Sequence, residues 1–317
     1  MMSRDLSDAD ALSRQSLRVE DWLLSAAEKL ASAKLPDAYQ EALCLLSIAT
    51  DLSVEVLIRE KKGLLNALPV SGLVSLENRL SVVLERRLTH EPMAYIRGSK
   101  AFCNHDYYVC PGVLIPRPET EHLIDCASSV ISALDIPKHR CLVVDVGFGS
   151  GVIPLEIRAL FPEVAIVAWD CSQDAYDCAR QNASLQGVTD IEWRHKDFFD
   201  DREAFCQLVS EYDHCVLCSN PPYISEAAYL SLDPDVRLHE PKEALVPGPL
   251  GDEIYVQLLS LLNGLGVTMV FEIGYDQENR LRSLCEESSA SVLDVITDLQ
   301  GHSRILLAES NTEVNDA

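Results

Sequence analysis

The chain has 317 residues, of which 47% are hydrophobic and 24% are charged, an ordinary composition for a globular protein of more than one domain. Its 26 Lys and Arg residues against 50 Asp and Glu residues give a net charge of −24, which disfavours long-range attraction to duplex DNA or RNA. No run approaches the ~20 apolar residues that span a bilayer, and residues 1–16 lack the apolar core of a secretory signal, so we expect a cytoplasmic protein.

Eleven cysteines are scattered along the chain and do not form the pattern of a disulfide framework. The nearest pair, Cys215 and Cys218, lies in an apolar run of strand character, where a three-residue offset places the side chains on opposite faces. A structural zinc ion needs four converging ligands. We therefore expect reduced thiols and no metal centre.

The first part of the chain predicts a small helical domain after a loose extension over residues 1–16. Apolar residues recur at helical spacing through residues 17–90, with breaks at Pro36-Asp37 and Leu68-Pro69 and a last helix over residues 71–87. Two interpretations of this domain stay open: it docks a substrate, or it is only a packing appendage.

Residues 91–116 differ in character, because aromatic and β-branched residues gather around a turn at Asn104-His105-Asp106. This pattern favours a β-hairpin that links two domains. A helix is expected to begin near Glu119 and to open a larger domain over residues 117–310, which leaves residues 311–317 as a tail.

The larger domain alternates strand-like and helical segments. The strand-like runs cover residues 141–146, 164–169, 191–194, 214–218, 267–273, 291–296 and 304–307. Such alternation is typical of an α/β protein with a doubly wound, seven-stranded, mostly parallel sheet of Rossmann-like type. The last two runs are joined by the short link 297–303, so we expect them to be antiparallel, because a parallel pair needs a longer crossover.

A glycine-rich loop follows the first of these strands. The strand ends at Val144-Asp145-Val146 and leads into Gly147-Phe148-Gly149-Ser150-Gly151, after which a helix begins. Glycines at such a turn let the backbone approach a ligand closely, and the start of the helix directs amide groups into the crevice. The dinucleotide pattern G-x-G-x-x-G is not met, because Pro154 occupies the position of a glycine.

Carboxylates follow the next two strands. Asp170 ends the second strand about twenty residues beyond the glycines, where it suits the two hydroxyls of a ribose; a solvated carboxylate at a strand end is the alternative. Asp197-Phe198 follows the third strand and suits the amine and the face of an adenine. An aromatic residue after a strand is often part of the core, and this alternative also stays open.

The fourth strand is followed by Ser219-Asn220-Pro221-Pro222-Tyr223. Two consecutive prolines stiffen the loop and have no N–H, so its carbonyl groups are available as acceptors. Asn220 adds a side-chain oxygen and Tyr223 a flat aromatic face. Such a loop suits a planar –NH₂ group, whose two hydrogens meet two acceptors while the ring stacks on its π system. A purely structural Asn-Pro turn is the alternative.

At these residues the chain resembles the release-factor glutamine methyltransferases, the HemK/PrmC family, within the seven-stranded S-adenosylmethionine-dependent fold. The resemblance extends over residues 91–307. Its motifs are Pro92 to Gly98, Leu114 to Glu121, Asp145 to Gly151, Asn220 to Tyr223, Asp235 to Arg237, Glu240-Pro241 and Phe271 to Tyr275. The stretch 115–121 discriminates best, because the Asn-Pro-Pro-Tyr loop also occurs in enzymes that methylate adenine or guanine amines. The family's helical N-terminal domain fits the start of this chain only in character.

The resemblance implies S-adenosyl-L-methionine as cofactor and a glutamine side-chain amide of a protein as acceptor. It implies that peptide chain release factors, at their Gly-Gly-Gln motif, are the partners. The implied cofactor contacts are Gly147, Phe148, Gly149, Ser150, Gly151, Asp170, Phe198 and Asn220. The implied catalytic residues are Asn220, Pro221, Pro222 and Tyr223. Phe148 departs from the family, where this position is usually small, and leaves the cofactor affinity open.

We expect direct methyl transfer in which the Asn220 oxygen and the Pro221 carbonyl accept the hydrogens of the acceptor amide. Positioning can supply up to ~7–11 kcal/mol, so no general base has to be invoked. One rival is a methyltransferase acting on a nucleobase amine in DNA or ribosomal RNA, which the acidic charge disfavours. Another, of a different class, is a non-catalytic module that binds a translation factor. The sequence does not determine the oligomeric state.

Overall fold

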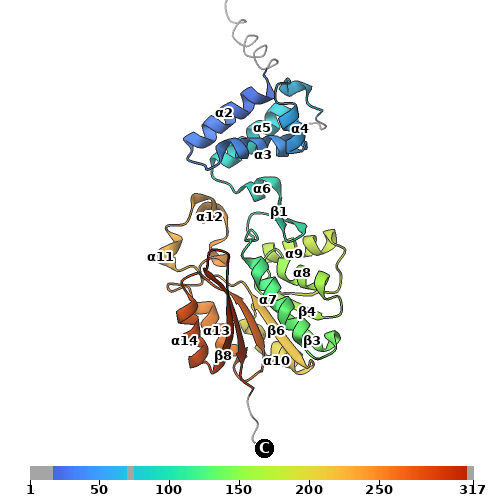
Figure 1. Cartoon of the computed structure of the whole chain (residues 1–317), viewed down its shortest axis with the longest axis vertical. Coiled ribbons are helices and arrows are strands. Elements are labelled where there is room, and N and C mark those ends of the chain that lie inside the picture. The colour runs from blue at the N-terminus through green and yellow to red at the C-terminus, as the bar shows by residue number, and fades with distance from the viewer. Residues whose placement is uncertain (1–16, 70–74, 313–317) are drawn as a thin grey trace, which may run out of the picture. The chain divides into compact units, whose positions relative to one another are not determined.

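A computed structural model of the chain describes residues 17–69 and 75–312 (Figure 1). Contacts divide the chain into two compact units, Met1–Arg97 and Gly98–Ala317. The extension predicted over residues 1–16, residues 313–317 of the predicted tail and residues 71–74 of the predicted helix lie outside the described residues. Within the described ranges, no helix is both long and apolar enough to cross a membrane.

The first unit is helical, as predicted. Its elements are α2 (Val19–Ser32), α3 (Ala38–Thr50), α4 (Val54–Arg59), η1 (Leu65–Ala67), α5 (Leu76–Leu88) and α6 (Met93–Arg97). Apolar residues at helical spacing, such as Leu23 and Leu30 of α2 and Leu45 of α3, form one buried core. Arg87 of α5 is 2% exposed, and its Nε and Nη2 donate to the two carboxylate oxygens of Glu41 at 2.7 and 2.8 Å. This bidentate pair connects α5 to α3 inside the unit.

The hairpin is shorter than the segment 91–116 to which the sequence assigns it. Pro92 precedes the short helix α6, and its carbonyl accepts the first backbone hydrogen bonds of that helix. The hairpin itself consists of β1 (Ser99–Phe102) and β2 (His105–Tyr108), which pair in antiparallel fashion. Tyr95, one of the aromatic residues of the predicted hairpin segment, therefore belongs to a helix, because proline favours a helix start at this point.

Seven strands form the sheet of the second unit. They are β3 (Cys141–Val146), β4 (Ala165–Asp170), β5 (Glu192–His195), β6 (His214–Ser219), β7 (Thr268–Glu272), β8 (Ala290–Thr297) and β9 (Ser303–Ser310). Their order is β5-β4-β3-β6-β7-β9-β8. The first five pair in parallel, whereas β9 runs antiparallel to both β7 and β8. The predicted fold class and the antiparallel final pair are confirmed.

Helices cover both faces of this sheet (Figure 1). The elements are α7 (Thr120–Ala133), η2 (Lys138–Arg140), α8 (Val152–Leu160), α9 (Gln173–Leu185), η3 (Phe199–Asp201), α10 (Arg202–Ser210), α11 (Glu226–Tyr229), α12 (Pro234–His239), η4 (Lys242–Ala244), α13 (Glu253–Leu262) and α14 (Glu278–Glu287). Buried residues of α7, α8 and α9 join one apolar cluster, and those of α10, α13 and α14 join another. Cys215 and Cys218 of β6 lie in different clusters, as their offset predicts.

The strand order reverses between β3 and β6, which are parallel neighbours with Asp145 opposite Cys218. Ligands of such sheets bind outside the carboxyl ends of the strands at this switch point. The Ser219 hydroxyl donates to the Val146 carbonyl at 2.7 Å and so joins the two strand ends. The loops after β3 and β6 therefore emerge side by side.

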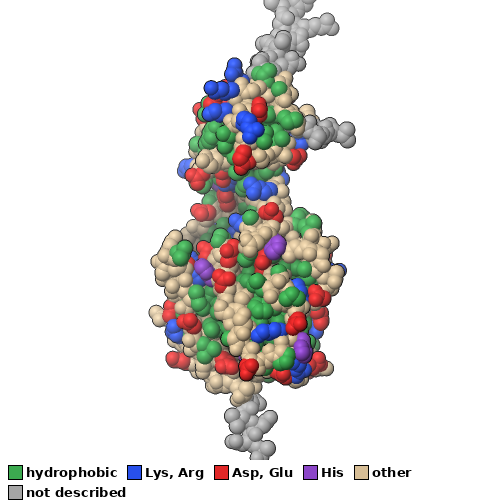
Figure 2. Space-filling model, turned by 45° about the vertical axis from the view of Figure 1, so that its right-hand side comes forward, with side chains coloured by type: hydrophobic (Ala, Val, Ile, Leu, Met, Phe, Trp, Pro, Cys, Tyr) green, Lys and Arg blue, Asp and Glu red, His purple; other side chains and the backbone are tan. Residues whose placement is uncertain are grey.

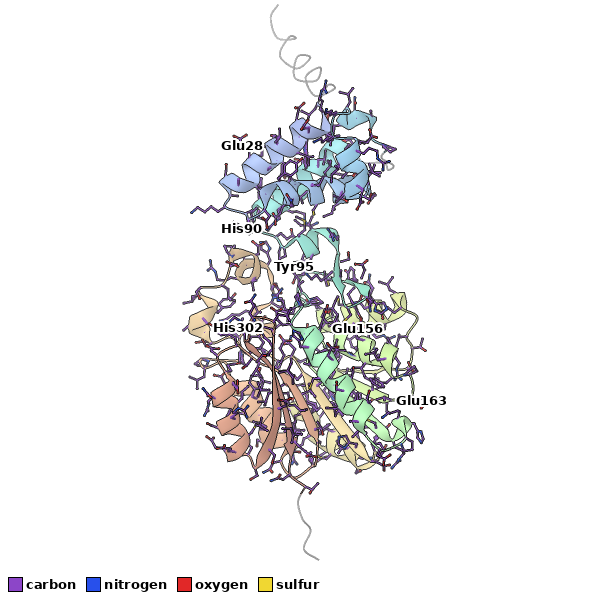
Figure 3. The ribbon with its side chains drawn as sticks, in the orientation of Figure 1. Glu28, His90, Tyr95, Glu156, Glu163 and His302 are labelled. Atoms are coloured by element: carbon purple, nitrogen blue, oxygen red, sulfur yellow. The ribbon has the colours of Figure 1, made fainter. Side chains whose placement is uncertain are left out.

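Two buried side chains connect the hairpin to α8 and to the glycine loop. Glu156 of α8 (Figure 3) accepts a hydrogen bond from the Tyr107 hydroxyl at 2.7 Å. Asn182 of α9 accepts from the Tyr108 N–H at 2.7 Å, and its Nδ2 donates to the Ser150 carbonyl at 2.9 Å. Because Asn182 is 1% exposed, these bonds are shielded from water.

Candidate functional site

The three glycines of the loop after β3 have different tasks. Gly147, Gly149 and Gly151 all have positive φ, at 79°, 52° and 82°. A Cβ atom at either of the first two would meet nothing within 4 Å, so their backbone borders open space. A Cβ atom on Gly151 would instead lie 3.0 Å from both Ala179 and Trp193. The first two glycines thus leave room for a ligand, while the third allows close packing of the helix that follows.

Phe148 lies between these glycines, but its ring faces inward. The side chain is 3% exposed and packs edge-on against Trp193, with ring centroids 5.1 Å apart. Ala168 of β4 and Ala175 and Ala179 of α9 belong to the same cluster. The small side chains of α9 make room for a ring that would otherwise point toward the open side of the loop. The departure from the family pattern is therefore accommodated by packing.

Asp170 ends β4 and reaches back to the glycine loop. Its Oδ2 accepts a hydrogen bond from the Gly149 N–H and its Oδ1 one from the Ser172 N–H, both at 2.9 Å. Burial raises the pKa of this carboxyl, and the two backbone bonds oppose the rise. Each oxygen has a second lone pair, so the carboxylate still has acceptor capacity for ribose hydroxyls.

Asp145 is a candidate ligand that the sequence reasoning missed. Its side chain is fully buried, and neither carboxylate oxygen has a hydrogen-bond partner within residues 17–69 and 75–312. Burial, and then the nearby charge of Asp170, raise the pKa of the Asp145 carboxyl well above its ordinary value. An unpaired carboxyl at the end of β3, directly before the glycines, is suited to a cationic ligand. The signal was a single acidic residue inside an otherwise apolar strand.

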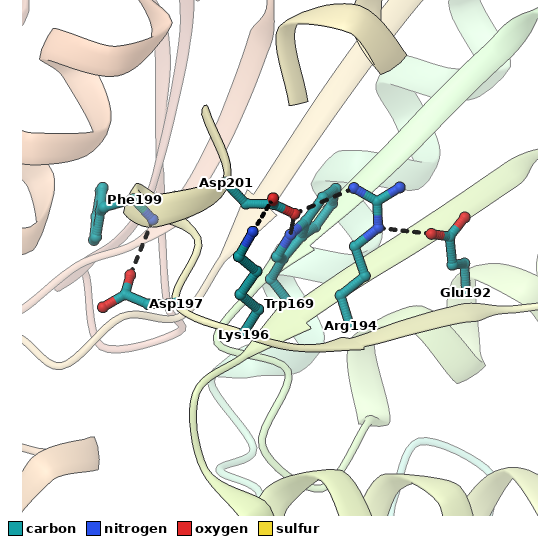
Figure 4. Close-up of polar contacts among 7 residues, drawn as sticks. All are labelled: Trp169, Glu192, Arg194, Lys196, Asp197, Phe199 and Asp201. Atoms are coloured by element: carbon teal, nitrogen blue, oxygen red, sulfur yellow. Dashed lines mark hydrogen bonds and ion pairs between the residues drawn. The ribbon is translucent and has the colours of Figure 1, made fainter. Parts of the chain in front are cut away.

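Phe198 is part of the hydrophobic core. It is 4% exposed, and its ring packs edge-on against Trp169 at 5.4 Å and Phe205 at 5.1 Å between centroids. The preceding Asp197 accepts a hydrogen bond from the Phe199 N–H at 2.9 Å (Figure 4). The predicted contact of Phe198 with an adenine face stays a prediction, and the ring itself has core neighbours on several sides.

A network of charged groups lies beside this aromatic cluster (Figure 4). The indole N–H of Trp169 donates to Asp201 at 3.1 Å, and the Arg194 guanidinium lies 4.5 Å from the Trp169 ring centroid. Lys196 also pairs with Asp201. The network fixes the segment after β5 and supports the position of residues 197 and 198.

The loop after β6 borders a cavity of about 230 Å³. The cavity is lined by Leu114, Arg117, Asn220, Pro221, Pro222, Tyr223, Ile224, Leu232, Val236, Ala244 and Leu245. All four residues predicted to contact an acceptor therefore line one space. Its walls are mainly apolar, so it suits a short side chain with one polar end.

The predicted segment 115–121 forms part of the same wall. The Arg117 guanidinium donates to Glu240 at 2.6 Å, and Glu240 also accepts from the Ile115 N–H at 3.1 Å. The Glu240 side chain is 1% exposed, so this pair is largely shielded from solvent. Two motifs separated by more than a hundred residues thus meet at the cavity.

A second contact connects segment 115–121 to the loop after β6. The Asn220 Nδ2 donates to the Thr120 hydroxyl oxygen at 3.1 Å, and the Thr120 hydroxyl donates to Glu272 at 2.6 Å. Tyr223 also donates to Glu272, at 3.4 Å. Thr120 and Glu272 both lie within motifs of the family resemblance, but the sequence assigns neither a role, because their contacts are non-local.

Comparisons with known proteins define the class first. The model of the methyltransferase small domain matches residues 120–236, which include the glycine loop and the loop after β6. The strand order and the two loops thus belong to a methyltransferase.

Relatives then define the family. A release factor glutamine methyltransferase of Enterococcus faecalis is 34% identical over 74% of this chain and 81% of its own length. Another with that name, from Caulobacter vibrioides, is 31% identical over 92% of this chain and 96% of its own length. The chain belongs to the release factor glutamine methyltransferase family, whose members are S-adenosylmethionine-dependent enzymes.

The residues present fit this cofactor. S-adenosylmethionine carries an ammonium and a sulfonium cation, and Asp145 offers a buried carboxyl to which no described residue is hydrogen-bonded. The open space beside Gly147 and Gly149 admits a ligand close to the backbone. Asp170 offers acceptors for the ribose hydroxyls.

Proposed function

We propose that this enzyme methylates the side-chain amide nitrogen of a glutamine in a protein, and that its acceptor is the Gly-Gly-Gln motif of class I peptide chain release factors. The relatives' names point to release factors. The observation that carries the proposal is the junction of segment 115–121 with Asn220 through Thr120 and with the cavity wall through Arg117. The family's most discriminating motif thus helps to build the acceptor site.

The cofactor is held, in this proposal, by the loop at residues 147–151 and by the carboxyl groups of Asp145 and Asp170. Bound S-adenosylmethionine supplies the methyl group, whose bond to sulfur breaks with its electron pair remaining on sulfur. The backbone at Gly147 and Gly149 allows close approach, and Asp170 also fixes the loop through the Gly149 N–H. The Asp145 carboxyl lies directly before the loop, and a cation bound beside it stabilises its ionised form.

The acceptor nitrogen is oriented by the loop after β6. The Asn220 oxygen and the Pro221 carbonyl accept its two hydrogens, while the Tyr223 ring stacks on the amide plane. Delocalisation weakens an amide nitrogen as a nucleophile, so hydrogen bonds that strengthen as positive charge develops on it lower the barrier. The excess proton leaves to water after transfer.

A nucleobase amine is the less favoured acceptor. The net charge is −24, and acidic side chains are spread among the basic ones on the face drawn in Figure 2. Nucleic-acid affinity depends mainly on cations that neutralise phosphates. A protein acceptor does not need such a surface. In the same proposal, the helical residues 17–90 dock the release factor, and the enzyme acts in the cytoplasm.

The acceptor can be tested directly. The enzyme, labelled cofactor and a class I release factor are incubated together, and the labelled peptide is mapped by mass spectrometry. We expect one methyl group on the glutamine of the Gly-Gly-Gln motif and none on a release factor in which this glutamine is replaced by alanine. Label on another residue, or on ribosomal RNA in a parallel reaction but not on the factor, contradicts the proposal.

A further prediction concerns Asp145. The pKa of an aspartate in an unfolded chain is about 3.9. Burial raises the pKa of Asp145 in the folded protein well above this value. At pH values between the two, Asp145 is protonated in the folded state and ionised in the unfolded state. The free energy of unfolding therefore falls as the pH rises through this window. Asp145→Asn removes this penalty, so we expect its Tm to exceed that of the wild type by more at pH 8 than at pH 5, by roughly 2–4 °C per kcal/mol recovered.

The same variant should bind the cofactor more weakly, because the cation loses its carboxyl partner. Thermal melts across the pH range and calorimetric titration with S-adenosylmethionine measure the two effects separately. If Asp145→Asn binds the cofactor with wild-type affinity, Asp145 is not part of the cofactor site. If the pH dependence of Tm is the same in the variant and the wild type, the pKa of Asp145 is not raised by burial.

A further inference from the structure

We propose that Thr120 and Glu272 are positioning residues that hold the Asn220 amide with its oxygen facing the acceptor nitrogen. The proposal rests on the function given above, because it concerns the same acceptor site. It also adds that the protonation state of Glu272 decides which end of the Asn220 amide the acceptor meets.

The three side chains form one chain of contacts. Glu272 is 1% exposed at the end of β7, and Thr120 is 3% exposed at the start of α7. The Thr120 hydroxyl bonds to Glu272 at 2.6 Å and to the Asn220 Nδ2 at 3.1 Å. The second Glu272 oxygen meets the Tyr223 hydroxyl at 3.4 Å. A single buried carboxyl therefore contacts both sides of the proposed acceptor site.

Donor and acceptor rules determine the direction of this chain. An ionised carboxylate can only accept, so the Thr120 hydroxyl must use its one hydrogen toward Glu272. The Thr120 oxygen can then only accept from Asn220, and the end of the Asn220 amide that faces Thr120 must be its NH₂ group. The Asn220 oxygen consequently points away from Thr120 and is available to accept a hydrogen from the substrate amide. An asparagine amide has no other intrinsic reason to choose between its two orientations.

Protonation of Glu272 removes this constraint. A protonated carboxyl can donate to the Thr120 oxygen, and the Thr120 hydroxyl can then donate to the Asn220 oxygen. The amide turns over and presents NH₂ to the acceptor nitrogen, which also carries hydrogens. Two donors facing one another do not bond, so this form is inactive.

Glu272 titrates in the range where this change matters. Burial, opposed by the Thr120 hydrogen bond, raises the pKa of Glu272 to about 7. The titratable and charged groups that face it are Glu119 before α7, Arg304 of β9, Tyr223 of the loop after β6 and Tyr255 of α13. Glu119 raises the pKa and Arg304 lowers it. The active, ionised form therefore predominates above this pKa and is lost as the pH falls through it.

Substitutions at Thr120 test the positioning role. Thr120→Val keeps the shape and loses the hydroxyl, and we expect single-turnover transfer at pH 8 with saturating release factor to slow about 10-fold, the scale of one lost neutral hydrogen bond. The Kd for S-adenosylmethionine should stay unchanged. Thr120→Ser should restore most of the rate, and Ser129→Ala, a hydroxyl loss on the exposed side of the same helix, serves as the matched control. Wild-type transfer by Thr120→Val overturns the proposal.

The variant Glu272→Gln tests whether the protonation of Glu272 controls the orientation of the Asn220 amide. In the wild type the single-turnover rate should rise with pH through a midpoint near 7, and in Glu272→Gln this step should be absent. A step that persists in the variant overturns the assignment to Glu272.

A second measurement does not depend on the acceptor. The side-chain amide of Asn220, assigned by the loss of its ¹⁵N signal in Asn220→Ala, should shift with the same midpoint in the wild-type protein but not in Glu272→Gln. If release factors are not methylated while this shift is present, the proposed function fails and the positioning role stands. An Asn220 signal that is independent of pH overturns the claim that protonation of Glu272 turns the Asn220 amide over.

Discussion

Asn220→Ala is expected to reduce kcat by about 10²–10³-fold, the loss typical of removing one preorganised hydrogen-bonding group at a reacting centre. The Asn220 oxygen is the acceptor that the Thr120 contact leaves facing the cavity. Its bond to the substrate nitrogen strengthens as positive charge develops there, so the defect should appear in the chemical step. Single-turnover transfer from labelled cofactor to the release factor measures this step.

Two controls make the Asn220 result specific. Cofactor affinity should be nearly unchanged, and Asn279→Ala, which alters an exposed asparagine of α14, should transfer methyl groups at the wild-type rate. If Asn220→Ala transfers at the wild-type rate with saturating acceptor, Asn220 contributes only to ordinary binding. The melting temperature should be measured as well, because Asn220 also bonds to Thr120.

Asp170→Ala is expected to weaken cofactor binding by about 10–150-fold, which corresponds to ~1.5–3 kcal/mol for charge-assisted hydrogen bonds. Two losses contribute. The ribose hydroxyls lose their carboxylate, and Gly149 loses the acceptor that fixes the glycine loop. Calorimetric titration with S-adenosylmethionine measures the change.

Glu163→Ala is the matched control for this variant. Glu163 (Figure 3) is an exposed carboxylate just before the start of β4, whereas Asp170 is the last residue of that strand. We expect Glu163→Ala to bind the cofactor as the wild type does. Equal affinities for Asp170→Ala and Glu163→Ala would exclude Asp170 from the site.

The sheet could be predicted from the sequence because its signals are local. Runs of strand character separated by helical segments mark all seven strands, and a short link before β9 requires an antiparallel turn. The predicted hairpin segment 91–116 is longer than the hairpin itself, because Pro92 precedes the helix α6 inside a segment rich in aromatic residues. Propensity alone does not separate a short helix from a strand in such a segment.

The site was only partly accessible from the sequence. The glycine loop and the loop after β6 can be recognised from local sequence patterns. No local pattern indicates which way an aromatic ring points, and the rings of both Phe148 and Phe198 are buried in the core. The contact between Thr120 and Glu272 joins residues 152 positions apart, so no local pattern contains it. These features depend on which elements pack together.

The position of β9 has a consequence for synthesis on the ribosome. β9 lies between β7 and β8 and pairs with both, although it follows them in the sequence. While the chain is being made, β7 has β6 as its only partner among the strands of the described sheet, and β8 has none until β9 emerges. Its buried residues, among them Ile305 and Leu306, also complete apolar clusters on both faces of the sheet. At ~5–20 residues per second, the stretch from the end of β7 to the end of β9 takes roughly 2–8 s to be made, and during this time the sheet is incomplete with an unpaired edge. A ribosome that stalls before Ser303 should leave a nascent chain that recruits chaperones or is degraded.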